Sequence, residues 1–233
     1  MSCAIRHKTE NCAPLPKKKG NDMTMSSPSP ESIARKTLPL PANLPMKGAY
    51  VDNGILSNVT PNTRPMLWRN ELWPNVESIY VAEKNPHAIV RGMPFWRLVL
   101  KHCAENGCHG IKRLGKPKSR GGLIDPLPDW DIRRIGAMAG ATTLKFAPGT
   151  HEAQWLAATP QSRLVEWNNW RDQFWGMSFR PPERTATGRN ILGMLLMMHK
   201  NRLAAGRPLF AATPDNLVAL GTSVTRFLLA NAA

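Results

Sequence analysis

The chain has 233 residues, and its 31 Lys and Arg against 16 Asp and Glu give a net charge of +15. No apolar run approaches the ~20 residues needed to span a bilayer, and the N-terminus lacks an apolar signal core, so we expect a soluble, cytoplasmic protein with no membrane partner. The cationic excess favours polyanionic partners such as nucleic acid or phosphate-bearing ligands, although a basic surface without such a partner has the same composition.

The four cysteines form two loose pairs, Cys3 with Cys12 and Cys103 with Cys108. Neither pair has the CxxC spacing common in zinc sites, and only two histidines stand near the second pair. We therefore expect free thiols, no metal and no cofactor.

Residues 1–45 have the composition of a disordered tail, with a Lys17-Lys18-Lys19 triplet and several Ser-Pro and Leu-Pro steps. This tail is either merely solvated or an electrostatic contact for nucleic acid. We expect one folded domain over residues 46–205 and a C-terminal helical extension over residues 206–233.

The first half of that domain predicts two short strands, Ala49–Val51 and Pro65–Trp68, with a tight turn signal at Asn53-Gly54. A helix opens at Pro74, whose missing N–H has no partner in a first turn, and ends by about Asn85-Pro86. The next helix spans Met93 to Glu105 and stops at Asn106-Gly107.

A basic, glycine-broken segment from Lys112 to Arg120 follows, suited either to wrapping a phosphate or to a solvated connector. The remaining expected elements are a helix from an Asp129 N-cap to about Phe146, a helix over Thr150–Ala158, strands at Leu164–Glu166 and Asp172–Met177, a loop at Pro181–Arg184, a helix over Ile191–Leu203 ended by Gly206, and a last helix from Thr213 to Leu229. This pattern predicts a single α+β domain that is mainly helical, with a small antiparallel sheet.

Glu77 stands in the first turn of the helix opened by Pro74, where the helix dipole favours a carboxylate. Such an acid is commonly a simple first-turn residue. The alternative is a catalytic carboxylate, and Lys84, further along the same helix, is either a site residue or an ion-pair partner that would hold the pKa of Glu77 low.

Several short motifs together support the catalytic alternative. In chain order they are Leu56-Ser57-Asn58, Trp73-Pro74-x-Val76-Glu77, Tyr80, Lys84, Arg113-Leu114-Gly115-Lys116, Asp129-Trp130-Asp131, Met138, Lys145-Phe146, Asp172-x-Phe174-Trp175-Gly176 and Gly188-x-Asn190-x-Leu192-Gly193-x-x-x-Met197. In this order, from about residue 49 to 204, the chain resembles the NADAR, or YbiA-like, family. It departs from the family at Val59, where Phe is usual, and at Ser78, where His is common, and both changes bear on the pocket wall.

The resemblance implies an N-glycosidase that hydrolyses the bond between ribose C1 and a base nitrogen. Its positions here assign Glu77 and Asp172 as the catalytic carboxylates, since breaking an N-riboside builds positive charge on the sugar that a fixed carboxylate stabilises. The implied substrate-binding residues are Asn58, Lys84, Arg113, Lys116, Trp130, Trp175, Gly176 and Asn190. Arg113 and Lys116 suit a phosphate clamp. Trp130 offers a flat face for the base, or is an ordinary core residue.

The net charge favours a substrate attached to DNA or RNA, most simply ADP-ribose on a guanine-type base. Two alternatives stay open: a glycosidase of ribosylamino pyrimidine intermediates of the riboflavin pathway, and a binder of ADP-ribose or nucleic acid without turnover. A pure binder has no need of the acid, so the presence of Glu77 favours an enzyme.

Overall fold

The computed structural model describes residues 54–159, 164–168, 171–180, 185–207 and 210–230. The tail, the Ala49–Val51 strand and the Pro181–Arg184 loop expected above lie outside these residues. The described helices are α2 (Val76–Ala82), α3 (Phe95–Asn106), α4 (Ile111–Leu114), α5 (Trp130–Lys145), α6 (His151–Ala158), α7 (Ile191–Ala204) and α8 (Leu217–Ala230), with 3-10 turns η1 (Gly54–Leu56) and η2 (Lys118–Arg120).

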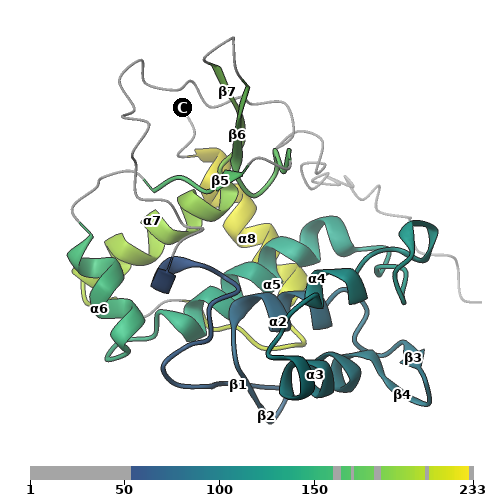
Figure 1. The fold of residues 1–233 in the computed structure, drawn as a ribbon. Helices are drawn as coiled ribbons and strands as arrows, with labels where there is room; N and C mark the ends of the chain where they lie inside the picture. Colours follow the sequence, from purple (N-terminus) through teal and green to yellow (C-terminus); the bar gives the residue numbers. More distant parts are fainter. Residues whose placement is uncertain (1–53, 160–163, 169–170, 181–184, 208–209, 231–233) are drawn as a thin grey trace, which may run out of the picture.

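The strands are short and belong to three separate sheets. They are β1 (Met66–Trp68), β2 (Glu71–Trp73), β3 (Ile89–Val90), β4 (Met93–Pro94), β5 (Trp167–Asn168), β6 (Met177–Arg180) and β7 (Thr185–Gly188). The β1–β2, β3–β4 and β6–β7 pairs are antiparallel, and β5 runs parallel to β6. The expected α+β class, mainly helical with small antiparallel sheets, is confirmed (Figure 1).

Helix α2 is the centre of the fold, because all seven of its residues are buried. Asn75 caps its N-terminus by accepting a hydrogen bond from the Ser78 N–H at 2.9 Å, and the Asn75 amide donates to the Val59 carbonyl at 2.8 Å. Helices α3, α4 and α5 and strand β2 pack against it. The short helix with a strand before it agrees with the sequence, although it begins at Val76 rather than Pro74.

The β1–β2 hairpin is fastened to the end of α2 by a buried carboxylate. Arg69 and Asn70 both have positive φ, as a two-residue hairpin turn requires. Glu83 follows the last turn of α2 and accepts hydrogen bonds from the Trp68 indole at 2.7 Å and from the Arg69 guanidinium at 2.6 and 2.9 Å. Because Glu83 is fully buried, these bonds compensate for the loss of water around its charge.

Three sequence predictions are wrong in detail. The Asp172–Met177 strand is a turn up to Trp175, because the Asp172 carboxylate accepts bonds from the Phe174 and Trp175 backbone N–H groups and curls the chain. The strand predicted at Leu164–Glu166 is instead β5, which begins three residues later, at Trp167. The last helix begins at Leu217 rather than Thr213, because the Asn216 side chain bonds back to Thr213 N and Ala211 O and holds a turn there.

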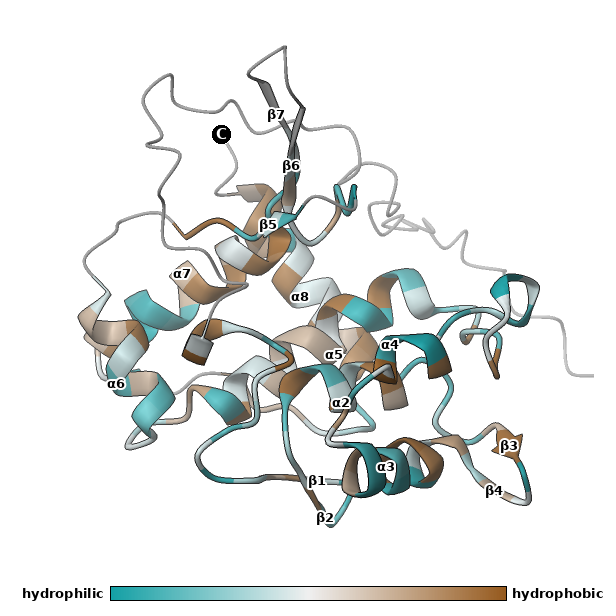
Figure 2. Cartoon of the chain, viewed as in Figure 1, coloured by the Kyte–Doolittle hydropathy of each residue, from teal (hydrophilic) through white to brown (hydrophobic). Residues whose placement is uncertain are grey.

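Helix α8 crosses α5 at two glycines. A Cβ on Gly136 would lie 1.9 Å from the Leu217 carbonyl, and one on Gly221 would lie 2.3 Å from the Ile132 carbonyl. The two backbones therefore touch, and α8, drawn mostly in brown and white in Figure 2, buries its apolar face there. No helix among the described residues is long and apolar enough to cross a membrane.

We expect Gly221→Ala to destabilise the protein by about 1–3 kcal/mol, because the added methyl must push the helices apart. Ser223→Ala, an exposed change on the same helix, is the control and should stay within about 0.5 kcal/mol. Urea unfolding followed by circular dichroism measures both. A Gly221→Ala protein as stable as the wild type would show that α8 does not depend on this close crossing.

Candidate functional site

Glu77 lies in the first turn of α2, and its residue is only 7% exposed. Its backbone N–H donates to the Asn58 carbonyl at 3.0 Å, which fixes the turn that carries the carboxylate. Burial raises the pKa of Glu77, and the negative charge of Asp172 raises it a little further. The positive charges of Lys112 and Lys84 lower it, but by less than burial raises it. The site therefore holds a desolvated carboxyl group whose pKa is raised.

Lys84 is not the direct ion-pair partner of Glu77. Its ammonium donates to the Gly115 carbonyl at 3.0 Å, and among the described residues no ion pair joins it to Glu77. Burial lowers the pKa of Lys84, while the charge of Glu77 partly raises it again. The alternative in which Lys84 holds the pKa of Glu77 below its ordinary value is wrong, because desolvation of the acid outweighs the attraction.

Four aromatic rings form a continuous cluster beside Glu77. Tyr80, one turn after Glu77, lies with its ring centroid 5.2 Å from that of Trp130 and 5.6 Å from that of Trp175. The Trp175 indole donates to the Tyr80 hydroxyl at 3.1 Å, and Phe174 meets Trp175 edge-on at 4.8 Å. Trp130 is only half-buried, so part of this cluster is open to a flat ligand.

Asp172 is held in one orientation by its own turn. Its Oδ1 accepts bonds from the Phe174 and Trp175 N–H groups, both at 3.0 Å. The side chain of Asn168 bonds both the N–H and the carbonyl of Asp172, at 2.8 and 2.7 Å. The negative charge of Asp172 raises the pKa of Glu77, so the two predicted carboxylates lie within electrostatic range of each other.

Gly176 and Asn190 lie in the scaffold behind the aromatic cluster. A Cβ on Gly176 would lie 2.4 Å from the Glu166 carbonyl, so the position excludes a side chain. Asn190 has φ +53°, and its amide bridges the Glu166 N–H at 2.9 Å and the Leu164 carbonyl at 2.8 Å. Their predicted role in substrate binding stays a prediction; the described contacts explain both residues through backbone geometry.

Asn58 faces the core under Glu77. Its Nδ2 lies 3.4 Å from the Met138 sulfur, whereas its Oδ1 is buried without a hydrogen-bond partner among the described residues. The backbone beside it is held by Lys145, whose buried ammonium donates to the Ser57 carbonyl at 2.6 Å. Burial lowers the pKa of Lys145 to about 8. A buried orphan acceptor costs free energy, so the Asn58 oxygen is a candidate contact for a ligand hydroxyl or a water.

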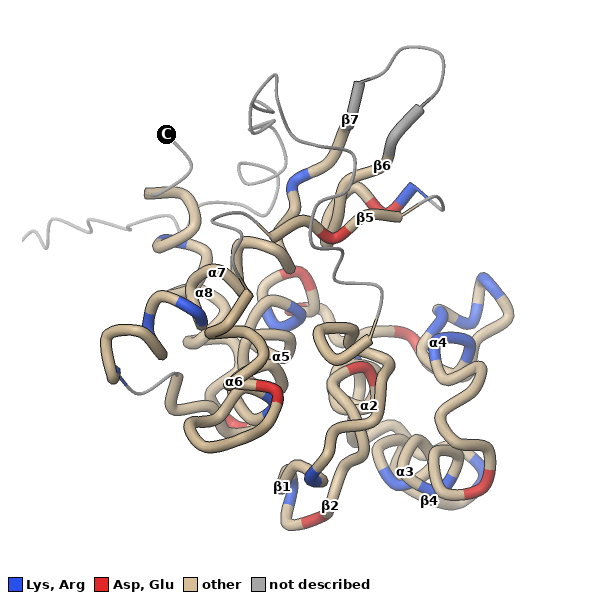
Figure 3. The backbone as a smooth tube through the Cα atoms, turned by 60° about the vertical axis from the view of Figure 1, so that its left-hand side comes forward, with Lys and Arg blue, Asp and Glu red and all other residues tan. Residues whose placement is uncertain are grey.

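Arg113 and Lys116 are exposed on α4 and the loop after it, where blue residues gather in Figure 3. The basic residue of this segment that acts on Glu77 is Lys112, which the sequence prediction missed although it directly precedes Arg113. Arg134, on α5, was also missed. It follows Trp130 by four residues, which places both on one face of the helix, and that spacing was the available signal.

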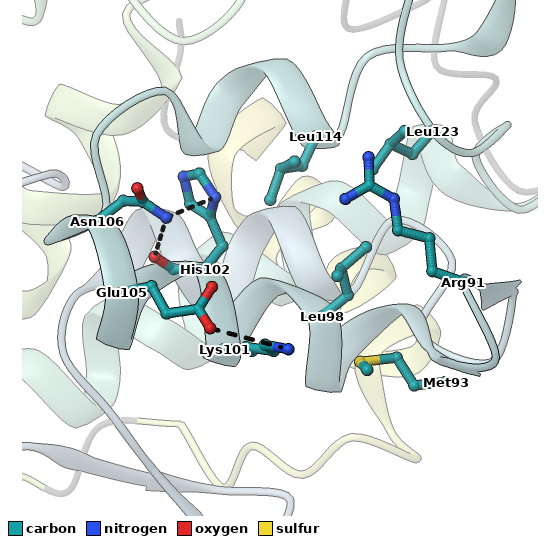
Figure 4. Close-up of a pocket in the computed structure, with 9 residues that line it drawn as sticks. All are labelled: Arg91, Met93, Leu98, Lys101, His102, Glu105, Asn106, Leu114 and Leu123. Carbon is teal, nitrogen blue, oxygen red and sulfur yellow. Dashed lines mark hydrogen bonds and ion pairs between the residues drawn. The ribbon is translucent and has the colours of Figure 1, made fainter.

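Two pockets lie apart from Glu77. One, of about 340 Å³, is walled by α3, the β3–β4 hairpin and Leu114, with Arg91 and Lys101 at its edge (Figure 4). The other, of about 580 Å³, lies between α7 and α8 and is rich in methionine. Within the described ranges no three His, Cys, Asp or Glu side chains cluster where they could hold a metal ion. Cys103 and Cys108 are free thiols, which agrees with the sequence prediction for this pair.

Comparison with known proteins identifies one family. The family model described as NADAR domain matches residues 47–204, which include the two carboxylates and all four rings of the cluster. No curated protein and no solved structure matches the chain. The chain belongs to the NADAR family, a family that is in general one of N-glycosidases.

Proposed function

We propose that the protein hydrolyses the bond between ribose C1 and a base nitrogen. The reaction removes ADP-ribose, or a related phosphoribosyl group, from a guanine-type base, and the preferred substrate is a base carried by nucleic acid. The observation that carries this proposal is a desolvated Glu77 beside a fixed Asp172 and an open aromatic cluster. A buried acid with a raised pKa suits proton transfer near neutral pH.

The residues support a definite sequence of events. The base lies against Trp130, the half-buried ring that packs on the buried Tyr80 at a centroid distance of 5.2 Å. The C1–N bond breaks, its electron pair passes to the base nitrogen, and the positive charge that develops on the ribose is stabilised by the carboxylates. Glu77 takes a proton from water as the water oxygen bonds to C1. That proton then passes to the released base nitrogen, so the hydroxyl group of water ends on the sugar, its proton ends on the base, and Glu77 returns to the carboxylate. Asp172 orients the ribose hydroxyls or assists the proton transfer.

The substrate carries phosphate, and the exposed Arg113 and Lys116 suit the backbone of an attached polynucleotide. The net charge of +15 favours such a partner over a small metabolite. Incubation with ADP-ribosylated guanine DNA beside a ribosylamino pyrimidine phosphate, with free base scored by mass spectrometry, separates the substrate classes. Release of base from the ribosylamino pyrimidine phosphate alone would show that this compound, rather than ADP-ribosylated guanine, is the substrate. Tight binding of either compound without release of base would indicate a binding protein without turnover.

Glu77→Gln should keep the fold and lower the rate of base release at least ~100-fold, because the change removes the charge from a nearly isosteric side chain. Single-turnover assays on the preferred substrate give the rate, and Glu71→Gln, an exposed change on β2, controls for loss of negative charge. A folded Glu77→Gln protein with the wild-type rate would return Glu77 to the role of a first-turn residue.

Lys112→Met should move the acidic limb of the kcat/KM–pH profile to higher pH. The carboxylate form of Glu77 is the base, so activity is lost as pH falls through its pKa, and Lys112 lowers that pKa. Removing its charge raises the pKa further and shifts the limb in the same direction. Lys118→Met removes an exposed charge from η2 and serves as the control. A limb that stays in place, or moves to lower pH, would contradict the electrostatic assignment.

A further inference from the structure

Two arginine side chains converge on one ring at the edge of the aromatic cluster. The Arg134 guanidinium carbon lies 3.7 Å from the centroid of the Phe174 ring, and that of Arg189 lies 5.5 Å from the same centroid. Arg134 comes from α5, whereas Arg189 stands between β7 and α7. Since the two residues are far apart in sequence, only the fold brings them to a shared ring.

The local charge around this pair is not balanced. Arg134 has one ion pair, at 3.2 Å with Asp131, whose side chain is 64% exposed and therefore well screened. Arg189 has no ion pair among the described residues. Burial, and then the like charge of Arg134, lower the pKa of Arg189. The Asp172 carboxylate lies near the same ring, but it accepts bonds from the Phe174 and Trp175 N–H groups and, in the described part of the chain, has no ion pair with either arginine. Two neighbouring cations of which only Arg134 has an ion pair, an exposed one, form a candidate site for an anion.

The pair also borders the catalytic carboxylates. Phe174 contacts Trp175, and Trp175 is hydrogen-bonded to Tyr80, which is one turn from Glu77. The charge of Arg134 acts on both Tyr80 and Lys84. The Arg134 side chain is 23% exposed, so its guanidinium is anchored on the ring and still reaches solvent. Arg134 also lies one turn after Trp130 on α5, so a ligand whose base lies against Trp130 is next to this pair.

We propose that Arg134 and Arg189 together bind the diphosphate of an ADP-ribosyl substrate, which makes the site selective for a diphosphate over a monophosphate. The planar guanidinium fork binds phosphate oxygens in pairs, and two forks on one ring match two linked phosphates. A bound diphosphate also removes the repulsion between the two cations. This assignment rests on the proposed glycosidase function and leaves Arg113 and Lys116 to an attached polynucleotide.

Titration calorimetry with ADP-ribose, ribose 5-phosphate and adenosine tests the proposal on the full chain. Arg134→Gln and Arg189→Gln should each weaken ADP-ribose binding about 10-fold or more, because charge-assisted hydrogen bonds are lost, and should change adenosine binding less than about 2-fold. Arg134→Lys keeps the charge but loses the fork and should show an intermediate loss. Arg133→Gln, next to Arg134 but paired with Asp129, is the matched control and should bind like the wild type.

Three results would overturn the assignment: unchanged ADP-ribose affinity in both glutamine variants, an equal loss for adenosine, or an equal loss in Arg133→Gln, which would indicate only the general field. Thermal unfolding of each variant confirms that the fold is retained. The two proposals fail separately. A wild-type protein that binds ADP-ribose through this pair but releases no base refutes the glycosidase proposal alone. Base release with an unchanged KM in a protein that carries both Arg134→Gln and Arg189→Gln refutes the diphosphate site alone.

Discussion

The burial of Glu77 is the constraint on which the site depends. Helix α2 is enclosed by its neighbours, so a carboxylate in its first turn loses water, and in the part of the chain that the structure describes it gains no direct ion-pair partner. Two lysines stand close enough to moderate the penalty, yet burial dominates and the pKa rises. The Asn58 carbonyl and the Asn75 cap hold the turn in place. The packing of the whole helix compensates for the free-energy cost of burying the Glu77 carboxylate.

The sequence predicted those parts of the fold that rest on local signals. The helix that carries Glu77 was predicted from the proline in its expected first turn, and the end of α3 from the Asn106-Gly107 stop. Helix α6 was also predicted, although Thr150 is its N-cap rather than its first residue. A strand was expected over Asp172–Met177, but the Asp172 side chain accepts hydrogen bonds from two backbone N–H groups and makes a turn. The outcome of that competition depends on the Asn168 clamp, which periodicity does not reveal.

The arginine pair shows the same limit for the site. Arg134 and Arg189 contact one ring only because α5 and the β7–α7 junction meet at Phe174, and no motif spacing predicts that meeting. The sequence directed attention to the dense basic run instead. That run lies on α4, on the loop after it and on η2, and its lysines and arginines are exposed (Figure 3). A dense run of charge along the chain thus indicated an exposed surface. It did not reveal the two arginines beside the rings, because they come from different elements that only the fold brings together.

The most direct test of the account is the pKa of the Glu77 carboxyl group. Carbon-13 NMR titration of the side-chain carboxyls, with the Glu77 signal assigned by its absence from the Glu77→Gln spectrum, measures this value in the folded protein. The account predicts a midpoint above the about 4.3 of an unperturbed glutamate, because burial outweighs the nearby lysines. A midpoint at or below that value would mean that Glu77 stays ionised by attraction and that its desolvation does not govern the site.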